Sequence, residues 1–280
     1  MTDSPIVSTE WLAKNIDAPD LVVVDGSWYL PAHQRDPKAE YRAEHIPGAV
    51  YFDIDEIADT SSGLPHMLPA PHVFSSKMRK LGIGDGQTIV VYDGMGLFSA
   101  ARVWWMFKAM GVESVYVLDG GLPKWKAEGR PVDDDPVRRP ERHFSARLDH
   151  ALVRDYDMVR SSLGNGSAQV VDARSAARFS GEAPEPRPEL SSGHMPGSLN
   201  LPFDQLLENG TLRSPGEIEA AFKQAGVDYS KPVITSCGSG VTAAILFLAL
   251  DMTGHRNIAL YDGSWTDWAS RDDAVIEKNA

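Results

Sequence analysis

The sequence is poor in cysteine, with Cys237 as the one example in 280 residues. A single cysteine excludes an intramolecular disulfide framework and a dithiol redox pair, and it is typical of a reducing compartment. Basic charge is also scarce: 27 Lys and Arg face 39 Asp and Glu, and a net charge of −12 disfavours nucleic acid or an anionic membrane as partner. Long apolar runs and a secretory signal pattern are missing as well. We expect a cytoplasmic protein without nucleic-acid or membrane partners.

The sequence contains two copies of one unit. The first half holds "VVVDGS", "HIPGAVYFDI", "TIVVYDGMGLFSAARVWWMF" and "VYVLDGGLPKW"; the second holds "QVVDARS", "HMPGSLNLPF", "PVITSCGSGVTAAILFLAL" and "IALYDGSWTDW" in the same order. This order indicates a tandem repeat of a unit of about 130 residues. A stretch rich in proline and charge separates the copies. We predict domains at residues 1–135 and 151–280, joined by a linker at 136–150.

Each copy alternates short β-branched runs with helical patterns. Runs such as "TIVVY" and "VYVL" have strand length and composition. Residues 214–226 are punctuated as a helix, because Ser214 can cap it, Pro215 suits its first turn, Glu217 completes a capping box and Gly226 can end it. The pattern predicts an α/β protein with two tandem domains, each a mostly parallel sheet flanked by helices.

Cys237 stands where an apolar run stops and a helical run is about to begin. That position predicts a strand-to-helix turn, in which backbone N–H groups at the helix N-terminus favour a negative charge on the sulfur. The thiolate is the reactive form of cysteine. Gly238 and Gly240 permit the tight curvature that wraps amides around it. The first copy carries Asp93 at this place, so thiol chemistry is available to the second copy alone.

Several other chemistries are disfavoured by the residues around this turn. A cysteine phosphatase needs an arginine six residues after the cysteine to clamp phosphate, and this chain has Ala243 there. No papain-like or caspase-like signature surrounds the cysteine. The run Asp133 to Asp135 is interpreted as a solvated linker segment, and no zinc-ligand spacing is present, so we expect neither metal nor cofactor. His45 and His194 occupy matching turns and are interpreted as structural.

The chain resembles the rhodanese superfamily, in its two-domain 3-mercaptopyruvate sulfurtransferase branch. The motifs that carry the resemblance are "HIPGAVYFDID", "PHMLP", "FSAARVWWMF", "ARFSGEAPEPRPEL", "GHMPGSLNLPF", "CGSGVTAA" and "YDGSW". The resemblance implies a transferase that takes sulfur from 3-mercaptopyruvate as a persulfide on Cys237 and releases pyruvate. Thioredoxin, small thiols or cyanide are the acceptors it implies.

The resemblance also implies roles for further residues. Arg178 and Arg187 are expected to grip the carboxylate and carbonyl oxygens of the keto acid, and both lie in a segment that we interpret as having no counterpart in the first half. A proton-transfer set is expected from Ser239, His66 and Asp55, which brings a histidine of the first domain to a site between domains. The resemblance further implies that Gly238, Gly240, Val241 and Thr242 bind the substrate.

Two alternatives stay open at this point. A thiosulfate:cyanide sulfurtransferase uses the same fold, but relatives that prefer thiosulfate carry basic residues directly after the cysteine, whereas this loop reads Cys-Gly-Ser-Gly-Val-Thr. A non-catalytic rhodanese-like binding module is the other alternative, with Cys237 as a redox sensor. The intact loop of the second copy argues against it.

Overall fold

The computed structural model describes residues 4–278, and these form two compact units. The N-terminal unit comprises residues 4–59, 68–149 and 209–212. The C-terminal unit comprises residues 60–67, 150–208 and 213–278. Each unit therefore includes one short segment from the other half of the chain, an exchange that the sequence pattern does not reveal.

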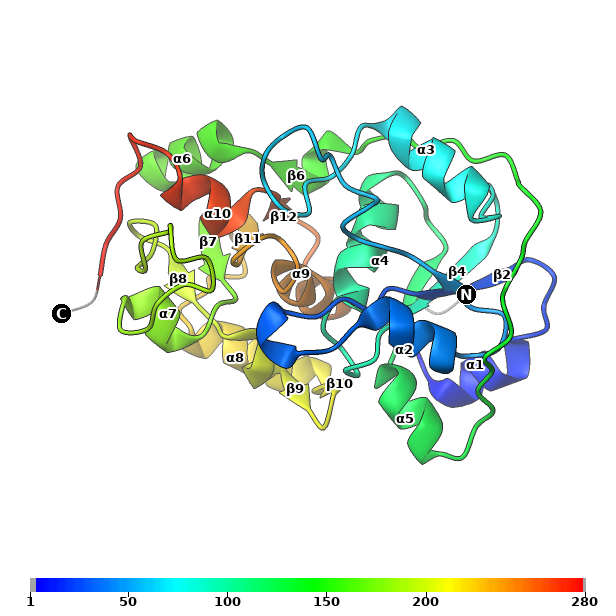
Figure 1. Cartoon of the computed structure of the whole chain (residues 1–280). Helices are drawn as coiled ribbons and strands as arrows, with labels where there is room; N and C mark the ends of the chain where they lie inside the picture. The colour runs from blue at the N-terminus through cyan, green and yellow to red at the C-terminus, as the bar shows by residue number, and fades with distance from the viewer. Residues whose placement is uncertain (1–3, 279–280) are drawn as a thin grey trace. The chain divides into compact units, whose positions relative to one another are not determined.

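The N-terminal unit is built on a five-stranded sheet in the order β1-β5-β4-β2-β3, with every pair parallel. Its central strands β2 and β4 are labelled in Figure 1. Its strands are β1 (Ile6–Val7), β2 (Leu21–Asp25), β3 (Val50–Tyr51), β4 (Thr88–Tyr92) and β5 (Val115–Leu118). Its helices are α1 (Thr9–Asn15), η1 (Pro31–His33), α2 (Pro37–Ala43), α3 (Pro71–Lys80), α4 (Ala100–Ala109) and α5 (Gly121–Ala127). The short strand β10 (Thr211–Leu212) belongs to the same unit.

The C-terminal unit repeats this plan with the sheet order β6-β12-β11-β7-β8, again with all pairs parallel. Its strands are β6 (Val153–Arg154), β7 (Gln169–Asp172), β8 (Leu199–Asn200), β9 (Leu207–Glu208), β11 (Val233–Ser236) and β12 (Ile258–Tyr261). Its helices are η2 (His150–Leu152), α6 (Tyr156–Asn165), α7 (Ala176–Ser180), η3 (Phe203–Leu206), α8 (Pro215–Gln224), α9 (Ala243–Met252) and α10 (Ser264–Ala269).

The two sheet orders correspond strand for strand, which confirms the α/β fold class and the duplication predicted from sequence. The helix predicted at 214–226 is also present as α8. Its capping box is complete, with Ser214 accepting from the Glu217 N–H and Glu217 accepting from the Ser214 N–H. Local side-chain chemistry thus sets this helix start.

Burial explains why these segments pack as they do. All five residues of β2 are buried, as expected for a central parallel strand covered on both faces. Helix α9 is buried from Ala243 to Leu250 and contacts β11, β12 and α8. Burying each of its larger side chains stabilises the unit by roughly 1.5–3 kcal/mol. The long helix after the cysteine is therefore a core element that holds the preceding loop in place.

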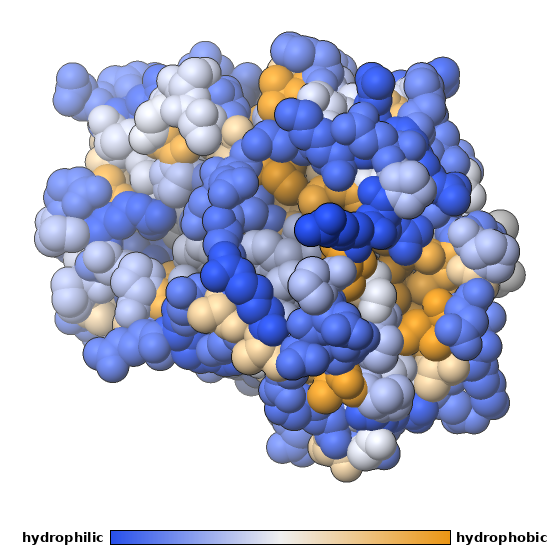
Figure 2. Space-filling view, turned by 45° about the vertical axis from the view of Figure 1, so that its right-hand side comes forward, coloured by the Kyte–Doolittle hydropathy of each residue, from blue (hydrophilic) through white to orange (hydrophobic). Residues whose placement is uncertain are grey.

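The face of the molecule shown in Figure 2 is mainly polar, with hydrophobic side chains gathered in separate patches. None of the helices in residues 4–278 has the length and apolar character that crossing a membrane requires.

Each sheet has a switch point at which successive connections diverge. In the C-terminal unit, the chain leaves β7 toward β8 on one side and leaves β11 toward β12 on the other. Ligands of open parallel sheets bind outside the carboxyl ends of the strands at such a point. β7 ends at Asp172 and β11 ends at Ser236, directly before Cys237.

Candidate active site

Cys237 opens the loop between β11 and α9, as the sequence pattern predicts. Its side chain is buried, with a relative exposure of 2%. The Cys237 N–H donates to Ser264 Oγ at 3.2 Å, and the carbonyl oxygens of Cys237 and Gly238 accept from the N–H groups of Trp265 and Thr266, both at 2.9 Å. The start of the loop is thus tied to the first turn of α10.

The matching loop of the N-terminal unit shows what this geometry does to an anion. Asp93 stands at the position of Cys237, because its carbonyl accepts from Leu122 N–H as that of Cys237 accepts from Trp265 N–H. The Asp93 carboxylate accepts from three backbone N–H groups, those of Met95 at 2.8 Å, Phe98 at 2.7 Å and Ala100 at 2.8 Å. This turn is therefore a cradle of amides around a negative charge.

In the C-terminal unit the amides of the cradle have no carboxylate to bind. Within residues 4–278, the N–H groups of Ser239, Thr242 and Ala243 donate to no backbone or side-chain acceptor of the protein. Gly240 has a φ of 79°, a left-handed conformation that suits glycine and lets the loop curve. Val241 packs into the interior with a relative exposure of 3%. The loop can therefore hold an anionic sulfur at Cys237.

Ser239 and His66 lie in direct contact inside the C-terminal unit. His66 belongs to the exchanged segment 60–67, and its Nδ1 lies 3.0 Å from Ser239 Oγ. Both side chains are buried. His66 has a φ of 61°, a conformation that costs a non-glycine residue free energy and is concentrated at functional sites. Asp55 belongs to the N-terminal unit and accepts from Trp28 Nε1 at 3.1 Å, so its expected link to His66 stays a prediction.

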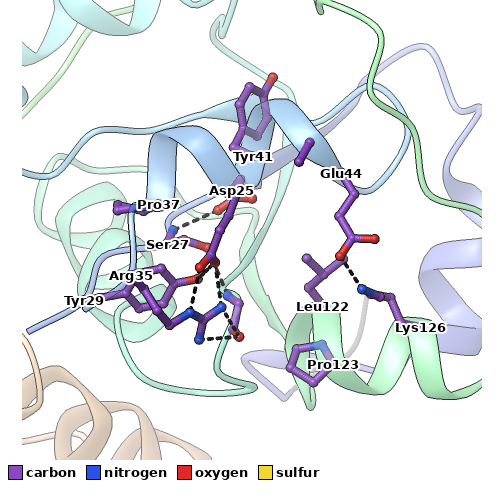
Figure 3. A pocket seen from close by; sticks show the side chains of 13 residues that line it. Asp25, Ser27, Tyr29, Arg35, Pro37, Tyr41, Glu44, Leu122, Pro123 and Lys126 are labelled. Carbon is purple, nitrogen blue, oxygen red and sulfur yellow. Dashed lines mark hydrogen bonds and ion pairs between the residues drawn. The ribbon is translucent and has the colours of Figure 1, made fainter. Parts of the chain in front are cut away.

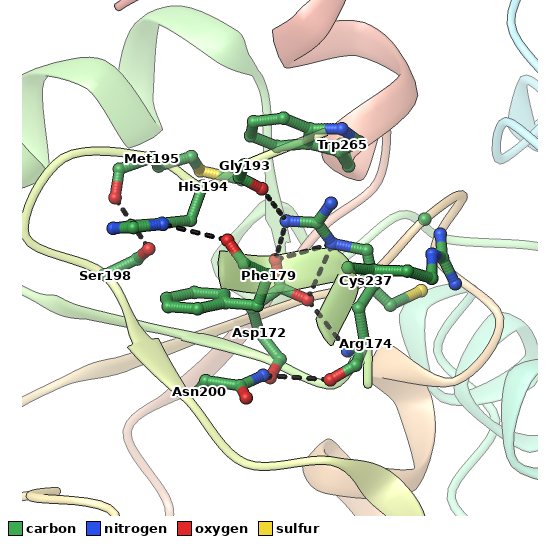
Figure 4. Close-up of polar contacts among 12 residues, drawn as sticks. Asp172, Arg174, Phe179, Gly193, His194, Met195, Ser198, Asn200, Cys237 and Trp265 are labelled. Atoms are coloured by element: carbon green, nitrogen blue, oxygen red, sulfur yellow. Dashed lines mark hydrogen bonds and ion pairs between the residues drawn. The ribbon is translucent and has the colours of Figure 1, made fainter. Parts of the chain in front are cut away.

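A buried ion network lies beside the cysteine, at the carboxyl end of β7 (Figure 4). Arg174 donates from Nε and Nη2 to the Asp172 carboxylate at 2.9 and 2.7 Å, from Nη1 to Glu185 at 2.7 Å and from Nη2 to the Gly193 carbonyl at 2.8 Å. Its guanidinium lies 4.1 Å from the ring centre of Trp265. Burial lowers the pKa of Arg174, but the two carboxylates outweigh burial, so this pKa lies above its ordinary value.

Arg178 is oriented by the same network. Its Nε donates to Glu185 Oε1 at 3.2 Å, and its Nη2 forms an ion pair with the other oxygen of Glu185. The guanidinium also lies against the cysteine loop, because a Cβ added to Gly238 would come within 3.2 Å of Arg178 Nη2. Gly238 therefore leaves the room that this arginine occupies.

The expectation that Arg178 has no counterpart in the first half is wrong. In both units the residue after this position stacks on a histidine and accepts from the Nδ1 of that histidine: Tyr41 with His45, and Phe179 with His194. The counterpart of Arg178 is consequently Glu40. Sequence comparison missed the match because the connections around the two helices differ in length between the units. The connection before α2 is longer than the one before α7, and the connection after α7 is longer than the one after α2.

Arg187 lies beyond α7 and is half-buried. In the described part of the chain, its guanidinium has neither a hydrogen bond nor an ion pair. The structure therefore offers one predicted arginine that is held by a carboxylate and one whose donors are all available.

Sequence reasoning missed Asp172, Arg174 and Glu185. The sequence did contain a signal for Arg174. The motif "VVDAR" in the second copy corresponds to "VVVDGS" in the first, and only the second copy has an arginine there. Within residues 4–278, the one cluster of three acidic or histidine side chains with metal-ligand spacing is Asp133, Asp134 and Asp135, in the mostly exposed linker region.

The fold and the site together define a tandem α/β protein with a cysteine-bearing anion loop in its second copy. A model of the rhodanese-like domain matches residues 8–128 and 155–271, so the chain belongs to the rhodanese family.

Two relatives and one solved structure cover most of the chain. It is 44% identical to the 3-mercaptopyruvate sulfurtransferase of Escherichia coli K12, over 99% of both chains. It is 43% identical to the thiosulfate sulfurtransferase of Cricetulus griseus, over 94% of this chain and 91% of that one. The crystal structure of SseA from Escherichia coli, described as a 3-mercaptopyruvate sulfotransferase of rhodanese fold, matches with a TM-score of 0.87 and 42% identity, covering 94% of this chain and 99% of that chain.

Proposed function

We propose that this protein is a 3-mercaptopyruvate sulfurtransferase that carries sulfur as a persulfide on Cys237 and releases pyruvate. The observation that carries the proposal is the pair of matching loops. The N-terminal loop binds the Asp93 carboxylate through three amides, and the C-terminal loop places Cys237 at the same point. Relatives that span nearly the whole chain are named for this activity.

The reaction follows from the chemistry of a thiolate in an amide cradle. The Cys237 thiolate attacks the sulfur of 3-mercaptopyruvate, forming an S–S bond while the C–S bond breaks. The electron pair of the broken bond stays on carbon as the enolate of pyruvate, which takes up a proton. The persulfide left on Cys237 is anionic, and the amides that favour the thiolate also stabilise its terminal sulfur.

The arginines and the Ser239–His66 pair supply the remaining parts. Arg187 has all its donors available for the planar carboxylate of the keto acid, and Arg178 offers its guanidinium beside Gly238. Ser239 lies two residues after the nucleophile and contacts His66 at 3.0 Å, which gives a route for the proton that the enolate needs. Asp55 is the third member that we propose for this set.

The loop favours mercaptopyruvate over thiosulfate as donor. Overall identity cannot choose between them, because relatives with both names are about equally similar. When thiosulfate reacts, the leaving sulfite gains negative charge, which cationic side chains beside the sulfur would stabilise. This loop has Gly238 and Ser239 there, both uncharged.

Thiol acceptors complete the cycle, because residues 1–280 hold no second cysteine that could resolve the persulfide. We propose small thiols or thioredoxin as physiological acceptors, with cyanide as an acceptor in the assay, in a reducing compartment that we take to be the cytoplasm.

Treatment with 3-mercaptopyruvate is expected to add the mass of one sulfur atom to the intact protein, and dithiothreitol should remove it. kcat/KM should be at least about tenfold higher with mercaptopyruvate than with thiosulfate. The reason is that the loop has no cationic side chain directly after the cysteine, whereas Arg178 and Arg187 are the cationic groups that we assign to the keto acid. The measurements are intact mass spectrometry and steady-state kinetics at fixed ionic strength. A higher kcat/KM for thiosulfate would contradict the donor assignment, and an unchanged mass with either donor would contradict the enzymatic function.

Replacing either arginine by lysine tests the assignment of the carboxylate grip. Arg178→Lys and Arg187→Lys keep the positive charge but lose the planar pair of donors. Each change should lower kcat/KM for mercaptopyruvate by about tenfold to a hundredfold, since a charge-assisted hydrogen bond is worth roughly 1.5–3 kcal/mol. Arg138→Lys, at an exposed position, is the matched control and should leave kcat/KM unchanged. Wild-type kinetics in both site variants would remove these residues from the site.

A further inference from the structure

The N-terminal unit contains a cavity of about 580 Å³ at the switch point of its own sheet (Figure 3). Asp25, at the carboxyl end of β2, lines it together with Ser27 and Gly94, and α2 and α5 supply further walls. The volume lies within the range of small-molecule sites. We call this cavity the Asp25 pocket. It lies wholly within the N-terminal unit and shares no lining residue with the cysteine site.

The duplicated fold shows which group this place is shaped for. Asp25 is the counterpart of Asp172, because both end the matching strand and both accept from the N–H two residues later, that of Ser27 at 2.9 Å and that of Arg174 at 2.9 Å. Ser27 is therefore the counterpart of Arg174. In the C-terminal unit the arginine fills the space over the aspartate, and in the N-terminal unit a serine leaves that space open.

The other walls of the Arg174 site have counterparts as well. Leu122 corresponds to Trp265, since both donate a backbone N–H to the carbonyl of the residue that opens the loop. Glu44 corresponds to Gly193, because each directly precedes a histidine that forms an isolated β-bridge, His45 in one unit and His194 in the other. The carbonyl of Gly193 accepts from Arg174 at 2.8 Å. Both Leu122 and Glu44 line the Asp25 pocket. Because the side chain of Leu122 is smaller than that of Trp265, it widens the space in the N-terminal unit further.

The charges that line the pocket leave one carboxylate without a cation. Arg35 donates to Glu40 from Nε at 2.8 Å and Nη2 at 2.6 Å, and its guanidinium lies over the Tyr29 ring at 3.9 Å. Lys126 pairs with Glu44. Asp25 is 2% exposed and has hydroxyl and amide donors around it but no ion pair within the described residues.

A buried carboxylate without a cation is unfavourable, and its titration reflects this. Burial raises the pKa of Asp25 to about 6, which still leaves the group mainly ionised at neutral pH. An incoming cation that hydrogen-bonds to this carboxylate would remove the unfavourable interaction. In the matching site of the C-terminal unit, Arg174 does this for Asp172.

We propose that the Asp25 pocket binds the guanidinium group of a ligand, in the place that the Arg174 guanidinium takes in the C-terminal unit. A guanidinium fits better than an ammonium, because it is planar, spans the carboxylate with two parallel N–H groups and keeps further donors for the Glu44 carbonyl. The group can come from free arginine or from an arginine side chain of a protein.

Isothermal titration calorimetry on the full-length protein tests this with two guanidinium probes, L-arginine and N-acetyl-L-arginine amide. At least one probe should bind saturably with a Kd of about 1 mM or tighter, as expected for a small ligand with one buried ion pair. L-citrulline, similar in shape but uncharged, should bind at least about tenfold more weakly. Preference for free arginine identifies a metabolite as the source, and preference for the blocked amide identifies a protein segment. Absence of saturable binding of both probes, or equal binding of citrulline, would overturn the proposal.

Two variants locate the binding. Asp25→Asn removes the charge and should weaken binding of the better probe by at least about tenfold. Ser27→Arg supplies an internal guanidinium and should abolish binding. Asp134→Asn makes the same charge change at an exposed position outside the pocket and should bind like the wild type. Circular dichroism reports whether each variant folds, and if Asp25→Asn does not, Ser27→Arg still decides. Wild-type affinity in a folded Asp25→Asn or Ser27→Arg variant would place the ligand elsewhere and overturn the proposal.

Discussion

Replacing Cys237 by serine is expected to lower turnover of 3-mercaptopyruvate by at least about a thousandfold, because the proposed nucleophile itself is removed. Serine occupies nearly the same volume and can keep the loop bonds to α10, in which the backbone of Cys237 and Gly238 takes part. Its hydroxyl is nevertheless a weak nucleophile at neutral pH and forms no persulfide. Pyruvate release and intact mass after donor treatment are the two measurements.

Alkylation of the wild-type protein provides a matched control. Because Cys237 is the sole cysteine, a thiol-specific reagent can modify no other thiol, and its effect should equal that of the substitution. Prior incubation with 3-mercaptopyruvate should leave a persulfide that the reagent labels with one additional sulfur. Pyruvate release by the Cys237→Ser variant at a rate near that of the wild type would end the persulfide mechanism.

Replacing Arg174 by methionine is expected to destabilise the C-terminal unit by about 3–5 kcal/mol, since it leaves two buried carboxylates without their cation. Asp172 and Glu185 have side-chain exposures of 1% and 2%, so water cannot compensate either charge. Methionine has a length close to that of arginine, which limits the loss of packing. Differential scanning calorimetry and urea unfolding measure the change.

The N-terminal unit provides the control for this prediction. Lys14→Met breaks the pair with Glu10, in which the two side chains are 70% and 68% exposed, and should destabilise the protein far less than Arg174→Met because solvent screens the pair. Adding Glu185→Gln to Arg174→Met should recover part of the loss by removing one of the buried charges. Equal destabilisation by Arg174→Met and Lys14→Met would contradict a role for burial.

Local patterns predict much of this molecule because the relevant interactions are short in sequence. The capping box at Ser214 and Glu217 involves one helical turn. The turn at Cys237 follows from an apolar strand, two glycines and a helical run that adjoin one another. The matching sheet orders follow from the repeated motifs, since the same strands in the same sequence pack in the same way.

Interactions between distant segments were less predictable. The counterpart of Arg178 is recognised through the stacking of Phe179 on His194, which no linear alignment shows. The bond between Arg174 and Glu185 forms because the segment between them folds back on itself. No local sequence pattern distinguishes Glu185 from a surface glutamate. The contact between His66 and Ser239 joins residues that are 173 positions apart.

The sequence by itself determined the fold class, the duplication and the candidate nucleophile, because hydrophobic periodicity and one unique cysteine are properties of the chain alone. The tertiary structure decided what surrounds those elements: the carboxylate that orients Arg178, the contact of His66 with Ser239 and the open space over Asp25. Those features depend on which side chains fill the space between packed elements. A serine or an arginine after the same strand leads to a pocket or to a buried ion pair only when the sheet, the loop and the following helix are in place.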